Sequence, residues 1–88
     1  MTALIKLSDR FVEVDIDQEI VVMRLDNGEF FALAETGAAI WRLIDGRRDK
    51  AALIDALAAD YAGGRAEIAA DVDELLRQLR DLGLLDDA

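Results

Sequence analysis

Apolar and polar residues alternate along the first third of the chain. Residues 11–16, FVEVDI, alternate apolar and acidic side chains with the period of a half-buried strand. Residues 19–25, EIVVMRL, are rich in β-branched residues and run into DNG at 26–28, which suits the positive φ angles of a tight hairpin turn. EFFALA returns over residues 29–34. The pattern predicts an antiparallel meander of three strands.

The remainder of the chain changes to helical spacing. Thr36 is the expected N-cap of a first helix that Gly46 ends, and Asp49 is the expected N-cap of a second helix that ends near Tyr61. A third helix is predicted over about residues 67–82. Its apolar arc is the strongest periodic signal in the chain and consists of Ile68, Val72, Leu75, Leu76, Leu79 and Leu82.

Three strands followed by three helices (βββααα) make one α+β domain over residues 1–88, with the helices on one face of the sheet. Residues 1–10 are expected to be a mobile N-terminal segment. Leu84 and Leu85 follow Gly83, so the chain can fold back there and close the core. The edges of such a sheet present unpaired N–H and C=O groups, which are protected, pair two copies in a homodimer, or capture another strand.

Composition narrows the class of protein. The chain has 88 residues, 53% of them hydrophobic and 33% charged, which is the make-up of a small folded domain. Nineteen acidic and ten basic residues give a formal charge of −9, which repels nucleic-acid phosphates and anionic membrane surfaces. Neither a signal peptide nor an apolar run of the roughly 18 residues needed to span a bilayer is recognisable. We expect a cytoplasmic protein with no nucleic-acid or membrane partner.

The sequence contains few residues that could carry out catalysis. The sequence has no His and no Cys, so the usual general base, thiolate metal ligands and Cys–His or Ser–His–Asp nucleophiles are missing. Asp15, Asp17 and Glu19 alternate around a turn, but without the glycine and glutamate spacing of a calcium loop. The sequence therefore favours a protein that is not an enzyme, with no cofactor and no metal.

From Val22 onward the chain carries an ordered series of motifs: a hairpin glycine, aromatic-x-Leu, small residues, Ile-Trp and Asp-Gly. In this order it resembles the PqqD-like family, the recognition elements of ribosomally made, modified peptides. The matching positions are Gly28, Phe31-Ala32-Leu33, Gly37, Ile40-Trp41, Leu43-Ile44-Asp45-Gly46, Leu57, Tyr61, Asp71-Val72, Leu75-Leu76, Leu79 and Gly83-Leu84-Leu85.

The resemblance implies a winged helix-turn-helix-like fold and a non-catalytic peptide chaperone. Family members look like domains that bind the leader of a precursor peptide as an added strand, along the third β-strand and against the last helix. Carried over to this sequence, the implied peptide-binding residues are Glu29, Phe30, Phe31, Ala32, Leu33, Asp71, Val72, Glu74, Leu75, Leu76 and Leu79.

Alternation along the third strand separates these residues. Phe31 and Leu33 share one face and match the family's core positions, which leaves Phe30 and Ala32 on the other. Phe30 either borders the peptide groove, or covers the hairpin or packs on the N-terminal segment. Of the apolar residues on the third helix, we expect at most two to touch a guest, and the rest to pack in the core with Trp41. The carboxylates of that helix either pair with a basic leader residue or remain solvated.

The implied partners are a precursor-peptide leader and the enzyme that processes it. That enzyme is a leader peptidase and cyclase of lasso-peptide maturation, favoured because the chain is short and free-standing, or a radical SAM enzyme of a pyrroloquinoline quinone-type pathway. The alternative function is a winged-helix DNA-binding or protein-interaction regulator. Against DNA binding, the third helix carries mostly acidic charge: Glu67, Asp71, Asp73, Glu74 and Asp81 against Arg77 and Arg80.

Overall fold

Three antiparallel strands form the main sheet in the order β2 (Phe11–Ile16), β3 (Glu19–Arg24) and β4 (Phe30–Leu33). The computed structural model describes residues 3–61 and 63–86. Asp17 and Gln18 join β2 to β3 with φ angles of 49° and 71°, the geometry of a two-residue hairpin turn. Gly28 supplies a φ of 73° in the turn before β4. The predicted meander is confirmed.

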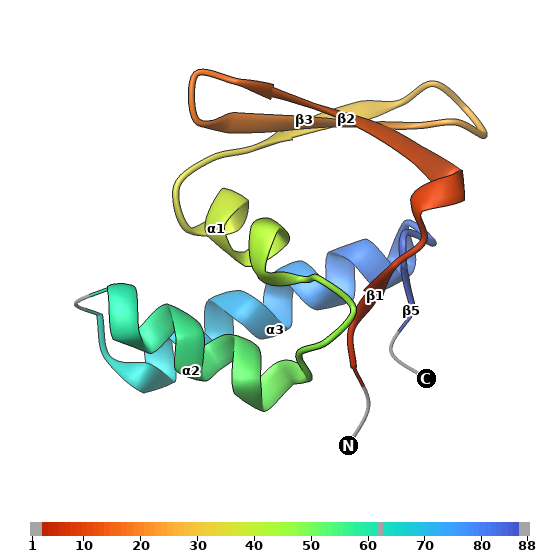
Figure 1. Ribbon diagram of the computed structural model, residues 1–88. Helices are drawn as coiled ribbons and strands as arrows, with labels where there is room; N and C mark the ends of the chain where they lie inside the picture. The colour runs from red at the N-terminus through yellow and green to blue at the C-terminus, as the bar shows by residue number, and fades with distance from the viewer. Residues whose placement is uncertain (1–2, 62, 87–88) are drawn as a thin grey trace.

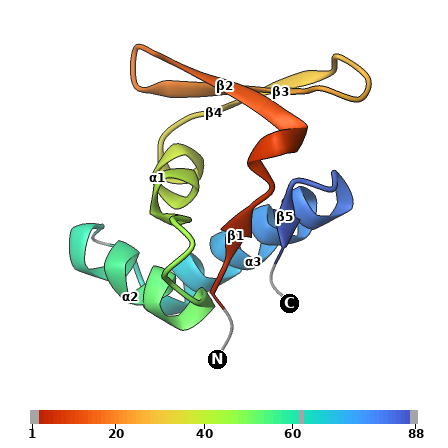
Figure 2. The same ribbon diagram turned by 45° about the vertical axis from the view of Figure 1, so that its right-hand side comes forward.

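The helices α1 (Thr36–Leu43), α2 (Lys50–Asp60) and α3 (Arg65–Asp81) lie together on one side of the sheet (Figures 1 and 2). Asp49 caps α2 as predicted, because its carboxylate accepts the Ala52 N–H at 2.8 Å. The predicted N-cap role of Thr36 is wrong, since Thr36 is the first residue of α1 and Glu35 precedes it with a φ of 54°. The Ala34 carbonyl accepts the first free N–H groups of α1 and replaces a side-chain cap.

The two ends of the chain pair with each other. β1 (Ile5–Lys6) and β5 (Leu85–Asp86) form a short antiparallel ladder, and a 3-10 turn, η1 (Ser8–Arg10), leads from β1 into the sheet. The sequence predicted a mobile segment over residues 1–10, whereas the structure holds the described part of it, residues 3–10, against the body. Leu4 shows why, because its side chain is only 2% exposed. Residues 1–2 lie outside the described ranges.

The turn after α1 holds this N-terminal segment. The Asp45 carboxylate accepts the Arg47 N–H at 2.9 Å and pairs with the Arg48 guanidinium at 2.7 Å. The Arg47 N–H is the main reason why the pKa of Asp45 lies below its usual value. Within this turn, the Gly46 N–H donates to the Leu4 carbonyl, and the Arg48 carbonyl accepts the Leu4 N–H. The Asp-Gly motif therefore anchors the beginning of the chain.

Gly83 ends α3 and turns the chain back, as predicted. It takes a φ of 74°, which is strained for a residue with a Cβ. The Gly83 N–H donates to the Arg80 carbonyl and the Leu84 N–H to the Leu79 carbonyl, both at 3.0 Å, so two carbonyls of the last helical turn are satisfied. Leu84 and Leu79 are each 1% exposed, so the turn also closes the core.

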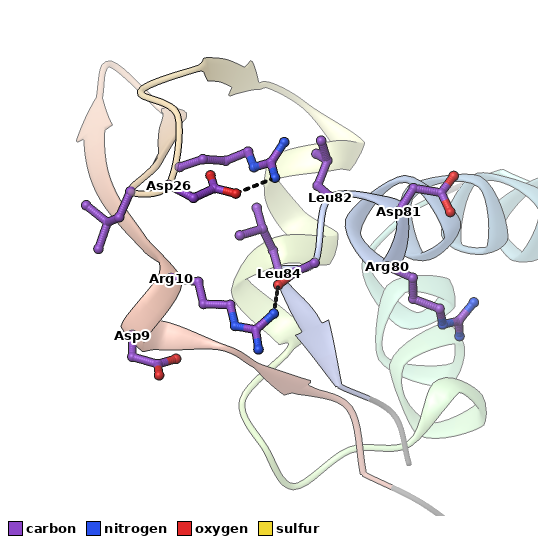
Figure 3. Close-up of a pocket in the computed structure, with 10 residues that line it drawn as sticks. Asp9, Arg10, Asp26, Arg80, Asp81, Leu82 and Leu84 are labelled. Atoms are coloured by element: carbon purple, nitrogen blue, oxygen red, sulfur yellow. Dashed lines mark hydrogen bonds and ion pairs between the residues drawn. The ribbon is translucent and has the colours of Figure 1, made fainter.

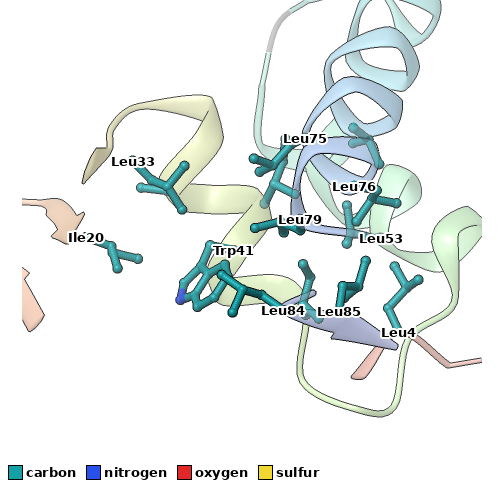
Figure 4. Close-up of a cluster of buried hydrophobic side chains, with 14 of the residues drawn as sticks. Leu4, Ile20, Leu33, Trp41, Leu53, Leu75, Leu76, Leu79, Leu84 and Leu85 are labelled. Atoms are coloured by element: carbon teal, nitrogen blue, oxygen red, sulfur yellow. The ribbon is translucent and has the colours of Figure 1, made fainter. Parts of the chain in front are cut away.

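Trp41 occupies the centre of that core and connects the sheet to the helices. In Figure 4 it lies between Ile20 of the sheet and the C-terminal leucines. Its ring meets Phe11 edge-on at 5.2 Å, and its indole N–H donates to the Glu13 carboxylate at 2.9 Å. The Lys6 ammonium lies 4.3 Å from the ring centre, where burial lowers the pKa of Lys6 although Glu13 and Asp45 act in the opposite direction.

β2 exposes its apolar residues instead of burying them. Phe11 is buried, but Val12, Val14 and Ile16 are 46%, 54% and 52% exposed. The acidic residues of the strand point toward the helices instead, where Glu13 binds Trp41 and Asp15 pairs with Arg42 at 3.1 Å. The face of the sheet away from the helices, called the outer face below, consists of Val12, Val14, Ile16, Glu19, Val21, Met23, Phe30 and Ala32.

Replacing Gly83 tests the chain reversal. A Gly83→Ala variant should lower the free energy of unfolding by about 1–2 kcal/mol, because alanine is disfavoured at positive φ. For a domain of this size that corresponds to a drop of several degrees in Tm, measured by circular dichroism. Gly63→Ala is the matched control, since its added Cβ makes only ordinary contacts with Glu67 and Ile68. Equal Tm values for the two variants would contradict a structural role for the positive φ.

Candidate functional site

Among the described strands, β4 pairs with β3 alone, so it is an edge strand of the main sheet. The Arg24 N–H donates to the Glu29 carbonyl at 2.8 Å, which fixes the alternation of the β3–β4 ladder. With the observed register, the main-chain groups of Phe31 and Leu33 point toward β3. Those of Phe30 and Ala32 then point away from β3, toward the open edge. This edge offers two N–H and two C=O groups to a guest strand.

The side chains of β4 divide between two faces as predicted. Phe31 is half-buried and Leu33 is 9% exposed, and both pack on the core. Phe30 and Ala32 belong to the outer face, with Phe30 74% exposed opposite Met23. The side chain of Phe30 is thus on the side of the sheet away from the helices, while its main chain borders the open edge. Phe30 can therefore contact one neighbour through its main chain and a different one through its side chain.

A groove begins where β4 passes into α1 and continues along α3. Its first hollow has a volume of about 330 Å³ and a second, adjoining one of about 220 Å³ shares Thr36 and Asp71 with it. We call the two hollows together the groove; no Lys or Arg lines either of them. Its lining residues are Ala34, Glu35, Thr36, Gly37, Ile40, Leu57, Tyr61, Gly63, Glu67, Ile68, Asp71, Glu74, Leu75 and Gln78.

α3 divides its predicted peptide-binding residues between this groove and the core. Asp71 and Glu74 are exposed and line the groove together with Leu75, which is 8% exposed. Val72, Leu76 and Leu79 are at most 1% exposed, so they support the helix from beneath. The structure therefore brings together three of the predicted α3 residues.

The turn residue Glu29 is only partly available. Its N–H donates to the Asn27 side chain at 3.0 Å and its carbonyl accepts from Arg24, so its main chain is already engaged in the hairpin. Its contribution to a site would come from the carboxylate alone.

Sequence reasoning missed part of the groove lining. Gln78 was identifiable from spacing, because positions 71, 74, 75 and 78 follow the i, i+3, i+4, i+7 pattern of one helix face. Glu35 and Thr36 gave no such signal. They reach the groove because the chain turns sharply at Glu35, whose positive φ is uncommon for a residue other than glycine.

A separate hollow of about 560 Å³ lies near the C-terminal end of α3 (Figure 3). Arginines and aspartates line it in mixed order. Arg24 pairs with Asp26 at 2.8 Å, and Arg10 donates to the Gly83 carbonyl at 3.3 Å. Arg24 and Arg10 thus already have partners, and the hollow does not present a cluster of charges of one sign to a ligand. The groove beside β4 is the better candidate for a binding site.

Within residues 3–61 and 63–86, no three Asp or Glu side chains come together in a way that could hold a metal ion. None of the helices in these ranges has the length and apolar character that a membrane crossing requires.

Curated relatives named "PqqA binding protein" occur in Rhodopseudomonas palustris. That of strain TIE-1 is 50% identical over 54 residues, or 61% of this chain and 53% of the relative. That of strain HaA2 is 51% identical over 49 residues, or 56% of this chain and 48% of the relative. The chain thus spans about half the length of these curated relatives.

Two solved structures share the fold. TbiB1, solved in complex with the TbiA(beta) leader peptide, is 32% identical with a TM-score of 0.83, over 96% of this chain and 98% of that one. Lasso peptide synthetase B1, complexed with the leader peptide, has a TM-score of 0.79 over 94% of this chain and 96% of that one, and its 24% identity supports the fold alone.

A family model shows to which group the chain belongs. The model for coenzyme PQQ synthesis protein D (PqqD) matches residues 19–85, from β3 through the three helices to β5. This range contains the open edge of β4 and the whole of the groove. The resemblance seen in the sequence motifs is thereby confirmed, and the chain belongs to the PqqD family.

Proposed function

We propose that this chain is a non-catalytic peptide chaperone. It binds the leader of a ribosomally made precursor peptide as an added strand on β4 and presents the peptide to a processing enzyme. The observation that carries the proposal is the open edge at Phe30 and Ala32 beside an acidic groove. The relatives named for binding PqqA and the leader complex of TbiB1 support a peptide as the ligand.

Main-chain pairing alone gives a guest modest affinity. Each of up to four hydrogen bonds at Phe30 and Ala32 contributes about 0.5–1.5 kcal/mol, whereas a micromolar Kd corresponds to about 8 kcal/mol. The rest has to come from side chains. Phe31 and Leu75 offer apolar contacts, and Asp71 and Glu74 favour a basic side chain in the guest. Main-chain pairing on β4 therefore fixes the register of the guest strand, and side-chain contacts in the groove select which peptide binds.

The groove, rather than the opposite edge of the sheet, supports β4 as the docking strand. β2 also lacks a second neighbour in the main sheet. On its inner side, however, Glu13 is bound to Trp41 and Asp15 to Arg42. A strand added to β2 would therefore meet side chains that are already engaged, whereas a strand added to β4 passes an unfilled hollow.

Peptide titration followed by hydrogen exchange tests the proposal. In the free protein, the amides of Phe30 and Ala32 should exchange at least roughly tenfold faster than those of Phe31 and Leu33, because they face the open edge. Adding a leader peptide should protect Phe30 and Ala32 and leave the other two unchanged. A PqqA-type and a lasso-type leader, titrated in parallel, identify the pathway. Duplex DNA at low salt is the control for a regulator; salt-sensitive DNA binding without leader binding would reject the proposal.

Proline at position 32 removes one edge donor without breaking the sheet. Because the Ala32 N–H points away from β3, Ala32→Pro should keep the fold and weaken leader binding by about tenfold or more, equivalent to about 1.4 kcal/mol. Phe31→Pro is the comparison variant, since it deletes a bond to β3 and should lower Tm clearly more. Calorimetric titration and thermal unfolding measure both. Wild-type affinity in a folded Ala32→Pro protein would contradict strand addition.

The groove carboxylates should contribute through charge. Asp71→Asn and Glu74→Gln should each weaken binding of a leader that carries a basic residue by about two- to fivefold at low salt, and less at high salt. Asp60→Asn, an exposed change outside the groove, is the matched control. A leader with its basic residue changed to Gln should bind all four proteins alike. Different affinities of the four proteins for this leader would mean that the substitutions weaken binding by altering the fold and not by removing an ion pair.

A further inference from the structure

The hollow near the C-terminal end of α3, called the end hollow below, is larger than either hollow of the groove. Its volume of about 560 Å³ falls within the roughly 300–1,000 Å³ of pockets that enclose small ligands. Three parts of the chain line it: η1, the end of β3 with the turn after it, and the end of α3 with the chain reversal after it. In Figure 3, Asp26 and Arg10 lie on one side of Leu84, and Leu82 and Arg80 lie on the other.

The charges of the end hollow balance. Three arginines and three aspartates line it, so its formal charge is zero in a chain whose formal charge is −9. The groove differs, because carboxylates line it and no Lys or Arg does. A charged side chain of either sign therefore gains little in the end hollow, and an uncharged side chain is the better match.

Leucines give the end hollow its apolar surface. Leu84 is buried and Leu82 is half-buried, whereas Leu25, in the turn after β3, is 54% exposed. These leucines come from different parts of the chain but line the same hollow. A large apolar side chain that entered the hollow would remove Leu25 and Leu82 from water together, which favours its binding.

Arginines form the remaining walls and are held in place. Arg24 lies on the inner face of β3 with the buried Val22, and its side chain is only 19% exposed. Asp26 binds the Arg24 guanidinium at 2.8 Å, and the Gly83 carbonyl accepts from that of Arg10 at 3.3 Å. The N–H donors of a guanidinium lie in its plane, so these bonds do not use its faces. Those faces stack on aromatic rings.

The end hollow lies at one end of the path that a strand added to β4 follows. Along α3, Gln78 lines the groove and Arg80 lines the end hollow, about 3 Å farther along the helix axis. Across the sheet, the Arg24 N–H donates to the Glu29 carbonyl, so Arg24 lies opposite the residue that precedes β4. The groove adjoins the other end of β4 at Ala34. A guest strand therefore has the groove at one end and the end hollow at the other.

Strand geometry indicates which guest residue reaches the end hollow. A guest that pairs with β4 lies two strand spacings from Arg24, which is about 10 Å. About three residues of extended chain span that distance once the guest has left the edge beside Phe30. The length of β4 between Glu29 and Ala34 adds about 17 Å. Side chains that enter the groove and the end hollow are thus about eight residues apart in the guest.

We propose that the end hollow is a second binding site for the guest peptide and takes one aromatic side chain from the segment that flanks the added strand. The inference rests on the proposed function, since it names a residue that such a peptide must carry. The ring packs on Leu25 and Leu82 and stacks on the Arg24 guanidinium. The chain thus selects a peptide with a basic residue for the groove and an aromatic residue about eight positions away.

A phenylalanine scan of the guest tests this proposal. The host is a leader peptide that protects the amides of Phe30 and Ala32 from hydrogen exchange, with alanine at every position that flanks its paired segment. One Phe is moved along the flanking positions, and calorimetry gives the Kd of each peptide. The Kd should fall by about tenfold or more at one position, about three residues beyond the strand at the Phe30 end. Lys or Glu at that position should bind no better than alanine, because the end hollow has no net charge.

A protein variant assigns the preference to the end hollow. Leu25→Asn should reduce the advantage of Phe to less than about twofold and leave the affinity for the alanine-flanked peptide unchanged. Ile16→Asn is the matched control, since Ile16 is 52% exposed but belongs to the outer face, and it should keep the full advantage. Thermal unfolding checks that both variants fold. Should Leu25→Asn unfold, Arg10→Gln is measured in the same way and should reduce the advantage by about threefold.

Equal affinity for Phe at all flanking positions would overturn the proposal, and so would a preference that the folded Leu25→Asn protein retains. Protection of Phe30 and Ala32 by the alanine-flanked peptide reports on strand addition alone. If no leader peptide protects these amides, the proposed function itself fails. If the peptides protect them without any preference for Phe, only the assignment of the end hollow fails.

Discussion

The buried contact between Trp41 and the sheet determines where everything else lies. The indole is 1% exposed, meets Phe11 edge-on and donates its N–H to Glu13, so α1 is held directly beneath the strands. With α1 in that position, β4 ends above the first turn of the helix and α3 stands opposite. The position of the acidic groove beside the edge of β4 is thus a consequence of one well-packed aromatic side chain. A side chain of this size, with its one polar atom satisfied, contributes several kcal/mol to the folded state.

The sequence predicted the helices and strands that follow from local patterns of residues. It did not predict the features that form only through contacts with distant parts of the chain. The apolar arc of α3, the Asp49 cap and the two faces of β4 follow from local rules, and the structure has all three. β1 and β5 are two residues long each, which is too short for any periodicity. The inward turn of Glu13 depends on Trp41, which lies 28 positions away, so nothing in β2 itself indicates it.

The candidate site divides in the same way. The edge of β4 was predictable, because a three-stranded meander followed by helices necessarily leaves edges. The groove was only half predictable, since Asp71, Glu74 and Leu75 follow helical spacing but Glu35 enters through an unusual backbone turn. Val72, Leu76 and Leu79 belong to the same arc, yet they face the core. Periodicity identifies a helix face, and only packing decides which part of it remains accessible.

The pairing of β1 with β5 has a consequence for how this fold can be joined to other polypeptides. β1 and β5 bring the two ends of the described chain side by side, on the side of the molecule away from the main sheet (Figure 1). A domain fused at either end would be tethered away from the open edge of β4 and from the groove, and would leave both unobstructed. The architecture is therefore suited to covalent attachment, with the tether length setting the effective concentration of whatever is attached.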